Sequence, residues 1–262
     1  YIFSGKSGAP SVSVDGLEYQ PGWAGRRHNL DYVPFDGNLQ VLVKDAISGD
    51  TIYLNSYSSL FQEWLHTPES KMHPVAMENT FLVPAPRHEA DVTVTLYDNR
   101  RNPMATVTHR VTPDDILIRR PDTSASVEHR YIHKSGSSKN KIDVAILAEG
   151  YTIEEMDSFY IHAEKAVESI LSHEPFKSRA NEFNFVAVAS PSKESGVSVP
   201  KNGQWKDTAF SSHYSTFYSD RYLTTTAVKS IHDVLRGIPY EHIIILANEY
   251  EYGGGGIFNF YT

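Results

Sequence analysis

The sequence predicts an α+β protein in which an N-terminal antiparallel β-sandwich precedes an α/β part with a mostly parallel sheet. Two patterns support this prediction. Several short runs in the first half, among them 38–56, 91–98 and 104–112, alternate apolar and polar side chains, as half-buried strands do. After residue 140, continuous apolar runs alternate with amphipathic stretches, which is typical of strands that helices cover on both faces. We therefore expect a first domain at 1–121, a linker at 122–140 and a second domain at 141–262.

The predicted strands of the first half come mostly in hairpins. Residues 38–56 contain two alternating runs around a turn, and Leu39, Val41 and Val43 fall on one face. Further strands are expected at 91–98, 104–112, 78–84 and 115–119. One helix is expected within residues 58–67, because Ser59 and Gln62 have the spacing of a capping box and an apolar face follows.

The second half has the order of a sheet with packed helices. Thr152 and Glu155 form a capping-box pattern at the start of its first helix. Buried strands are expected at 141–150, 183–190 and 241–248, and helices at 151–171 and 226–240. The segment at 122–140 is polar and rich in serine, which predicts a link between the two parts.

Composition excludes several classes of protein. A net charge of −8 argues against general nucleic-acid binding, which needs a basic surface. The absence of cysteine excludes disulfides, thiolate zinc sites and cysteine nucleophiles. No apolar run is long enough to span a bilayer. Because the sequence begins with Tyr1 rather than methionine, a signal peptide would not be visible in it.

Candidate functional side chains follow the predicted parallel strands. In open α/β sheets, such groups gather at the carboxyl ends of the strands. Glu149 and Tyr151 follow the first of these strands, and Asp207 lies in a long loop at 190–219 that contains few apolar residues. An alternative is that the two carboxylates only cap or fasten loops.

The familiar catalytic motifs are incomplete. The run Gly253–Gly256 follows a strand but precedes β-branched and aromatic residues rather than a helix, so it does not predict a phosphate site. No G-x-S-x-G motif is present. His129 and His133 have H-x-x-x-H spacing, but Arg130 stands where H-E-x-x-H requires glutamate, and we interpret the pair as surface histidines. The residues alone contain no complete catalytic constellation.

Several segments nevertheless resemble, in the same order, the IgA-peptidase family of bacterial zinc metallopeptidases (metallopeptidase family sixty-four). They are "AEGYT", "EPF", "SPSKESGVS" and "YGGGGIFNFY" in the second half, with "PGWAGRRHNL" and "YSSLFQEWL" in the first. The resemblance implies a hydrolase, a zinc metalloendopeptidase with a β-sandwich before a zincin-like domain. It also implies a peptide or protein substrate and an extracytoplasmic location, either secreted, periplasmic or on the cell surface.

The sequence departs from the family pattern at its end. In the family an H-E-x-x-H helix follows the glycine-rich strand, where two histidines bind zinc and the glutamate acts as general base. The sequence reaches Thr262 before such a helix, and none of its residues matches those positions. Zinc is therefore expected for the complete enzyme, and this chain alone is expected to bind no catalytic zinc and to cleave nothing.

The terminal glycines gain a role from the resemblance. Zincin-like peptidases align a peptide substrate along a sheet edge through main-chain hydrogen bonds. Glycine at such an edge lets a second backbone approach. The residues expected to form this edge are Gly254, Gly255, Gly256, Ile257, Phe258 and Asn259. The alternative is a flexible glycine loop leading into an ordinary strand.

Two other functional classes stay open. The first is a non-catalytic module that binds a glycan or a protein, which exposure of Trp23 and Trp64 would favour. The second is an unrelated α/β hydrolase that uses Glu149 or Asp207, which clustering of both carboxylates in one pocket would favour.

Overall fold

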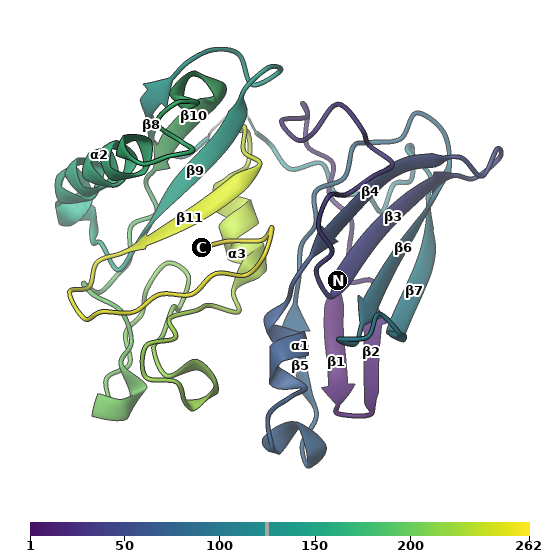
Figure 1. Ribbon diagram of the computed structural model, residues 1–262, viewed down its shortest axis with the longest axis horizontal. Helices are drawn as coiled ribbons and strands as arrows, with labels where there is room; N and C mark the ends of the chain where they lie inside the picture. The colour runs from purple at the N-terminus through teal and green to yellow at the C-terminus, as the bar shows by residue number, and fades with distance from the viewer. Residues whose placement is uncertain (124–125) are drawn as a thin grey trace. The chain divides into compact units, whose positions relative to one another are not determined.

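The chain forms two compact units in a computed structural model that describes residues 1–123 and 126–262 (Figure 1). Residues 124 and 125 of the predicted linker lie outside the described residues. The first unit comprises Tyr1–Pro21, Gly25–Asp122 and Ile257–Phe260, and the second comprises Gly22–Ala24, Thr123–Gly256 and Tyr261–Thr262. A short piece of the C-terminal segment thus belongs to the first unit, which the sequence did not indicate.

The first unit contains two antiparallel sheets. One has the strand order β4-β3-β6-β7 and the other β2-β1-β5. The strands are β1 (Ile2–Lys6), β2 (Ala9–Ser13), β3 (Leu39–Asp45), β4 (Thr51–Tyr57), β5 (Val75–Glu78), β6 (Ala90–Tyr97) and β7 (Pro103–Val111). Both predicted hairpins, β3–β4 and β6–β7, are confirmed as antiparallel pairs. The strands β1 and β2 were not predicted.

The core of this unit follows the predicted alternation. Leu39, Val41 and Val43 are fully buried, and the residues between them in β3 are only half-buried. The predicted helix is confirmed in a shorter form as α1 (Leu60–Trp64). The Ser59 side chain accepts a hydrogen bond from the backbone N–H of Gln62, as an N-cap residue does.

Two predicted strands are wrong in whole or in part. Residues 115–118 form no strand, because the Asp115 carboxylate accepts the backbone N–H of Leu117 and folds the chain locally; Arg119 alone of this stretch forms an isolated bridge, with Glu18. Of the strand expected at 78–84, only Glu78 lies in β5; the residues after it include Pro84, which has no N–H to pair.

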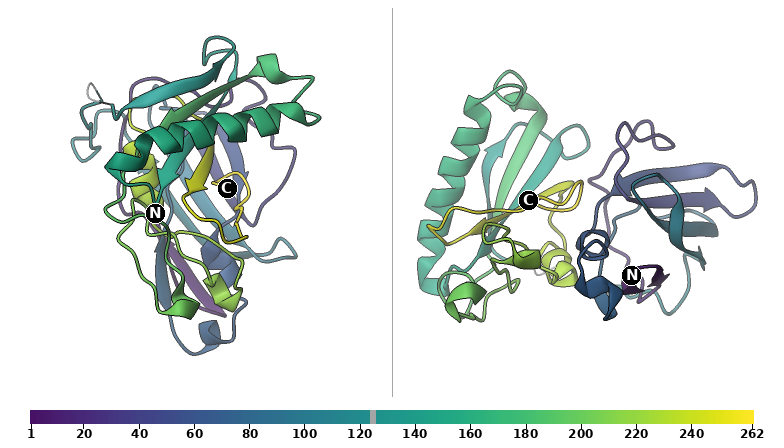
Figure 2. Two further views of the ribbon diagram at one scale, coloured as in Figure 1. Left: turned by 90° about the vertical axis from the view of Figure 1, so that its left-hand side faces the viewer. Right: turned by 60° about the horizontal axis from the view of Figure 1, so that its bottom comes forward.

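The second unit contains one mixed sheet with strand order β11-β9-β10-β8. Its elements are β8 (His129–Lys134), β9 (Ile142–Glu149), α2 (Met156–Ser172), β10 (Phe183–Val188), α3 (Val228–Val234) and β11 (His242–Ala247). The strands β9, β10 and β11 run parallel, so the predicted parallel core is confirmed. The helix α2 lies along one face of this sheet, as Figure 2 shows, and packs on it through Phe159, Ile146 and Phe185.

The strand β8 corrects the prediction of a linker at 122–140. It pairs antiparallel with β10 at the edge of the sheet, and His133 contacts the ring of Phe185. An edge strand has solvent on one side and tolerates polar residues, so its composition resembles that of a loop. His129 and His133 therefore lie on a strand, and His133 Nε2 forms a hydrogen bond with the Ala180 carbonyl.

No helix in the described part of the chain combines the length and the apolar character that crossing a membrane requires.

Candidate functional site

The long loop after β10 is fastened to the carboxyl end of β9 by Glu149. This side chain is fully buried. Its carboxylate accepts hydrogen bonds from the Thr208 hydroxyl (2.8 Å) and from the backbone N–H groups of Phe210 (3.0 Å) and Ser212 (2.8 Å). A buried carboxylate needs such donors, because burial without partners is costly. Glu149 thus holds the loop in place.

Asp207 lies in a different environment. It is exposed and forms an ion pair with the Lys193 ammonium at 2.8 Å. Its backbone N–H donates to the Glu194 carboxylate at 2.6 Å. The Glu149 carboxylate is therefore buried with three donors, whereas the Asp207 carboxylate lies in solvent. This difference gives no support to a hydrolase that uses the two carboxylates together.

Tyr151 is buried next to the turn that follows β9. Its hydroxyl lies 3.0 Å from His162 Nδ1 on α2, and its backbone carbonyl accepts the N–H of Ser192 at 2.7 Å. Burial raises the pKa of the Tyr151 hydroxyl to about 12, so it stays protonated at neutral pH. These contacts give Tyr151 a supporting position between the helix and the loop.

A polar network that the sequence did not reveal links the ends of β9 and β11. The Asn248 amide donates to the carbonyl of Gly150 (3.1 Å) and to the Ser195 hydroxyl (3.3 Å), and that hydroxyl donates to Glu155 (2.8 Å). The N–H of Thr152, followed by the Ser195 hydroxyl, lowers the pKa of the Glu155 carboxyl. The capping-box pattern identified Glu155, but no local pattern connects it with residues so distant in sequence.

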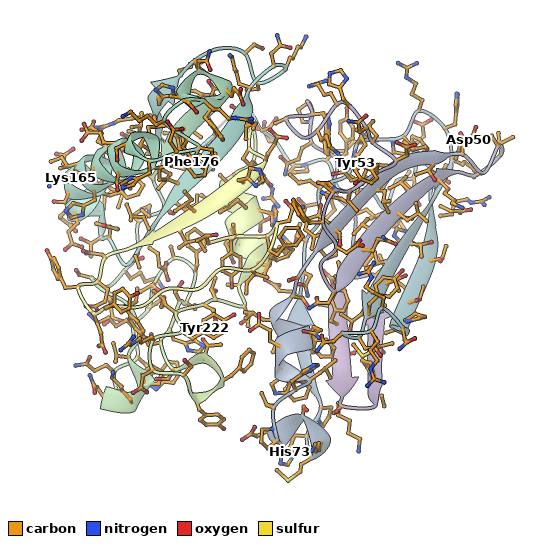
Figure 3. All side chains as sticks on the ribbon, viewed as in Figure 1. Asp50, Tyr53, His73, Lys165, Phe176 and Tyr222 are labelled. Carbon is orange, nitrogen blue, oxygen red and sulfur yellow. The ribbon has the colours of Figure 1, made fainter. Side chains whose placement is uncertain are left out.

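The glycine run passes closely against the segment before α3. Gly254 donates its N–H to the Arg221 carbonyl (3.0 Å) and accepts the N–H of Leu223 (3.3 Å), beside Tyr222 (Figure 3). A Cβ on Gly253 would lie 2.4 Å from the Tyr214 ring, and one on Gly255 would lie 2.4 Å from the Leu223 carbonyl oxygen. Glycine is required at these two positions because other parts of the same chain approach closely there. That a substrate backbone approaches this run stays a prediction.

The other backbone groups of this run are open. Among residues 1–123 and 126–262, no partner is found for the N–H or C=O of Gly253, Gly255 or Gly256. Gly253 and Gly256 are exposed, and a Cβ on Gly254 would meet nothing within 4 Å. The run thus offers unpaired main-chain donors and acceptors at the surface.

The residues after the glycines do not form the strand that their composition predicted. Ile257–Phe260 is a turn, closed by a hydrogen bond from the Phe260 N–H to the Ile257 carbonyl at 2.9 Å. Asn259 has φ +57°, a left-handed conformation that asparagine adopts more readily than most residues. Ile257 and Tyr261 are single bridge residues, and Thr262 pairs with β11 by donating to Ile243 (3.0 Å) and accepting from Ile245 (2.7 Å).

The two tryptophans singled out for a binding module are not both exposed. Trp64 is buried in the first unit, where its ring contacts Phe61. Trp23 is half-buried. The burial of Trp64 removes part of the support for a glycan- or protein-binding patch.

The described residues do not fit a zinc ion. In residues 1–123 and 126–262, no three side chains of His, Cys, Asp or Glu come together in an arrangement that could hold a metal. Zinc sites in proteins need at least three such ligands. Whether this chain binds zinc in solution stays a prediction.

Comparison with known proteins identifies the family. Residues 131–262 match the family model described as IgA Peptidase M64, and residues 1–108 match the one described as Peptidase M64 N-terminus. A comparison with curated proteins gives no match. The two family matches together span both units, and the chain belongs to the IgA peptidase M64 family.

Proposed function

We propose that residues 1–262 are the N-terminal portion of a zinc-dependent metallopeptidase and that Gly253–Gly256 aligns its peptide substrate. Membership in the M64 family implies a metallopeptidase that acts on protein. We assign substrate alignment and support of the sheet to this part of the peptidase; among the residues that the structure describes, 1–123 and 126–262, no group of three His, Cys, Asp or Glu side chains could hold a metal. The observation that carries the proposal is the open main chain of the glycine run.

A peptide in extended conformation binds best where main-chain groups are unpaired and no side chain stands in the way. The N–H and C=O groups of Gly253, Gly255 and Gly256 meet the first condition. None of the three carries a side chain of its own, although Tyr214 packs against Gly253 and Tyr222 against Gly255. The outer edge of β11 meets the first condition less well, because Thr262 already pairs with Ile243 and Ile245. The glycine run is therefore the better place for strand addition, with Ile257, Phe258 and Asn259 as the turn that ends it.

This proposal assigns supporting roles to the three other predicted residues. Glu149 holds the loop that leads to Leu223 through its hydrogen bonds, and Tyr151 contacts both α2 and the same loop. Asp207 forms an ion pair at the surface. None of them has an arrangement that suggests proton transfer to a substrate.

The family resemblance supports four further inferences about fold, location, binding and activity. We infer a β-sandwich for the first unit, a zincin-like catalytic domain for the second, an extracytoplasmic location and no role in nucleic-acid binding. We also infer that a polypeptide of residues 1–262 is inactive. Zinc-dependent proteolysis by this polypeptide, with its intact mass confirmed, would refute that inference.

A titration followed by NMR tests the alignment role. An acetylated octapeptide of alternating alanine and threonine is added to the ¹⁵N-labelled protein. The amide signals of Gly253–Gly256 should shift, whereas those of Gly8 and Gly49, two glycines at turns of the first unit, should not. Shifts that spare the glycine run at saturating peptide would contradict the proposal.

A further inference from the structure

We propose that the loop at 215–222 makes the peptide edge selective for an aromatic or large aliphatic side chain, with Phe217 and Tyr222 as the specificity-determining residues. This inference rests on the proposed alignment role of Gly253–Gly256 and adds the class of side chain that the edge takes. The loop and the glycine run both belong to the second unit. Three features of the loop support the inference: its backbone conformation, its contact with the run and its apolar surface.

The loop holds three non-glycine residues in the left-handed region. Ser215, Phe217 and Tyr218 have φ +62°, +50° and +64°. For a bulky aromatic residue this conformation is an outlier, and it costs free energy that the surrounding structure must offset. The buried hydroxyl oxygen of Ser215 also has no hydrogen-bond partner among the described residues. The loop is therefore not arranged for stability alone, and strain of this kind clusters at ligand-binding segments.

Hydrogen bonds at the base of the loop maintain this conformation. The Thr216 N–H donates to the Tyr222 carbonyl at 3.2 Å, and the Thr216 hydroxyl lies 2.7 Å from that of Thr224. Both threonines are buried, and hydrogen bonds are stronger where water is excluded. Phe217 and Tyr218 are thus carried on a turn whose base is closed.

The same loop supplies a ring that lies against the glycine run. A Cβ on Gly255 would lie 2.9 Å from Cε2 of Tyr222, and the residues on either side of Tyr222 pair with Gly254 (Figure 3). The Phe217 ring lies next to that of Tyr222, with their centroids 6.3 Å apart. Both residues are half-buried, so part of each stays accessible. A peptide on the open groups of Gly255 would therefore bring a side chain to these two rings.

The chemistry of this surface favours an apolar side chain. An aromatic or large aliphatic group buries apolar area on the two rings, whereas a charged group would lose part of its hydration there. The loop's own charges, Asp220 and Arg221, are of opposite sign. Arg221 lies over the Tyr252 ring, 5.4 Å from its centroid. The loop therefore offers no net charge that would select a charged side chain instead.

Three peptides test this selectivity on the ¹⁵N-labelled protein. One is the alanine–threonine octapeptide, and in the other two a central residue is replaced by phenylalanine or by lysine. In titrations followed by NMR, the phenylalanine peptide should bind about tenfold more tightly than the alanine–threonine peptide, as one added apolar group does in a hydrophobic site. The lysine peptide should gain no affinity. The phenylalanine peptide should shift the signals of Phe217 and Tyr222 as well as those of Gly253–Gly256.

A substitution at Phe217 tests the residue itself. Phe217→Asn removes the ring and keeps a left-handed backbone, which asparagine tolerates. The ratio of the affinities for the phenylalanine and alanine–threonine peptides should fall to less than about twofold. Because asparagine relieves strain, the Tm should not fall, as it would if Phe217 only supported the loop. Phe217→Tyr keeps the ring and should keep the ratio. Phe35→Asn, at an exposed phenylalanine of the first unit, is the control and should leave the ratio unchanged.

The outcomes separate this inference from the alignment role. Equal affinities of the phenylalanine and alanine–threonine peptides, or a ratio that Phe217→Asn leaves unchanged, would overturn the inference while the alignment role stands. If Phe217→Asn does not fold, nuclear Overhauser effects in the unaltered protein decide. Their presence between the peptide's phenylalanine ring and the rings of Phe217 and Tyr222 supports the inference, and their absence overturns it. If no peptide shifts a glycine signal, the alignment role fails, and this inference fails with it.

Discussion

The two halves of the C-terminal segment are held in opposite ways. Gly253–Gly256, in the second unit, is held by the two backbone hydrogen bonds of Gly254. It packs closely against its neighbours because Gly253 and Gly255 have no side chains. Ile257–Phe260, in the first unit, is held by an asparagine amide and two phenylalanines. The difference shows that neighbouring stretches of one chain can be held in place by different means, one by backbone pairing and the other by side chains. The predictions below test each way of holding the chain, beginning with the largest expected effect.

The stability of the long loop after β10 depends most on Glu149. Glu149→Gln replaces an acceptor oxygen by a donor that faces the three donors of Thr208, Phe210 and Ser212. Losing hydrogen bonds to a buried charged group should lower the free energy of unfolding by about 3 kcal/mol. Urea denaturation measures this loss. Asp207→Asn, at the exposed ion pair, is the control and should change stability by less than about 0.5 kcal/mol. Equal effects of the two substitutions would show that Glu149 is no anchor.

Acidification should weaken the second unit through His232. Burial lowers the pKa of this histidine to about 4, with its Nδ1 2.6 Å from the Tyr240 hydroxyl. In the unfolded chain the pKa is near 6.5, so the unfolded state takes up the proton first as the pH falls. The free energy of unfolding should therefore decrease between about pH 6.5 and pH 4, by about 3 kcal/mol in all.

Unfolding in urea at several pH values measures this dependence. His232→Gln should remove that part of the pH dependence, whereas His173→Gln, at an exposed histidine, should leave it unchanged. If the free energy of unfolding depends on pH in the same way in the unaltered protein and in His232→Gln, His232 is not the source of the acid sensitivity.

Within Gly253–Gly256, substitutions of neighbouring glycines should differ in their cost to stability. Gly255→Ala places a methyl group 2.4 Å from the Leu223 carbonyl oxygen and should cost about 1–3 kcal/mol of stability. Gly254→Ala meets nothing within 4 Å and should cost less than about 0.5 kcal/mol. Thermal denaturation of the two variants compares these costs. If both are equally tolerated, the glycines are not there for close approach.

A single substitution in Ile257–Phe260 should lower the free energy of unfolding by less. Phe260→Leu keeps an apolar side chain but removes the ring contacts with Tyr57 and Phe81, and should cost about 1 kcal/mol. The cost should be smaller when Phe81→Leu is already present, because only the contact with Tyr57 is then left to lose, and a double-mutant cycle in urea would measure the difference. Strict additivity of the two substitutions would argue against packing of the turn on this site.

Much of the fold could be predicted because local patterns determine it. The alternation of Leu39, Val41 and Val43, the capping of α1, the capping box of the 3-10 turn Ile153–Glu155 before α2, and the apolar runs of β9, β10 and β11 each occupy a short stretch of sequence. The edge strand β8 was missed because solvent on one side permits its polar residues. The predicted strands at 115–119 and beyond Glu78 failed because turn-forming side chains and proline outweighed β-propensity.

The candidate site could be predicted only in part. The glycine run was expected to let a substrate backbone approach, with a flexible loop as the alternative, and the structure shows Tyr214 and Leu223 of the same chain lying closely against it. The edge expected to continue through Ile257, Phe258 and Asn259 is a turn instead, in which the Asn259 amide finds its acceptors on β4, about two hundred residues earlier in the chain. The Asn248–Ser195–Glu155 network likewise joins distant segments, and no periodicity records such contacts.

The most direct measurement of the central claim is a structure of the complete peptidase with a bound peptide inhibitor. The account predicts main-chain hydrogen bonds between the inhibitor and at least one of Gly253, Gly255 and Gly256, the positions whose backbone groups are open here. A well-ordered inhibitor that makes no main-chain contact with residues 253–262 would contradict it.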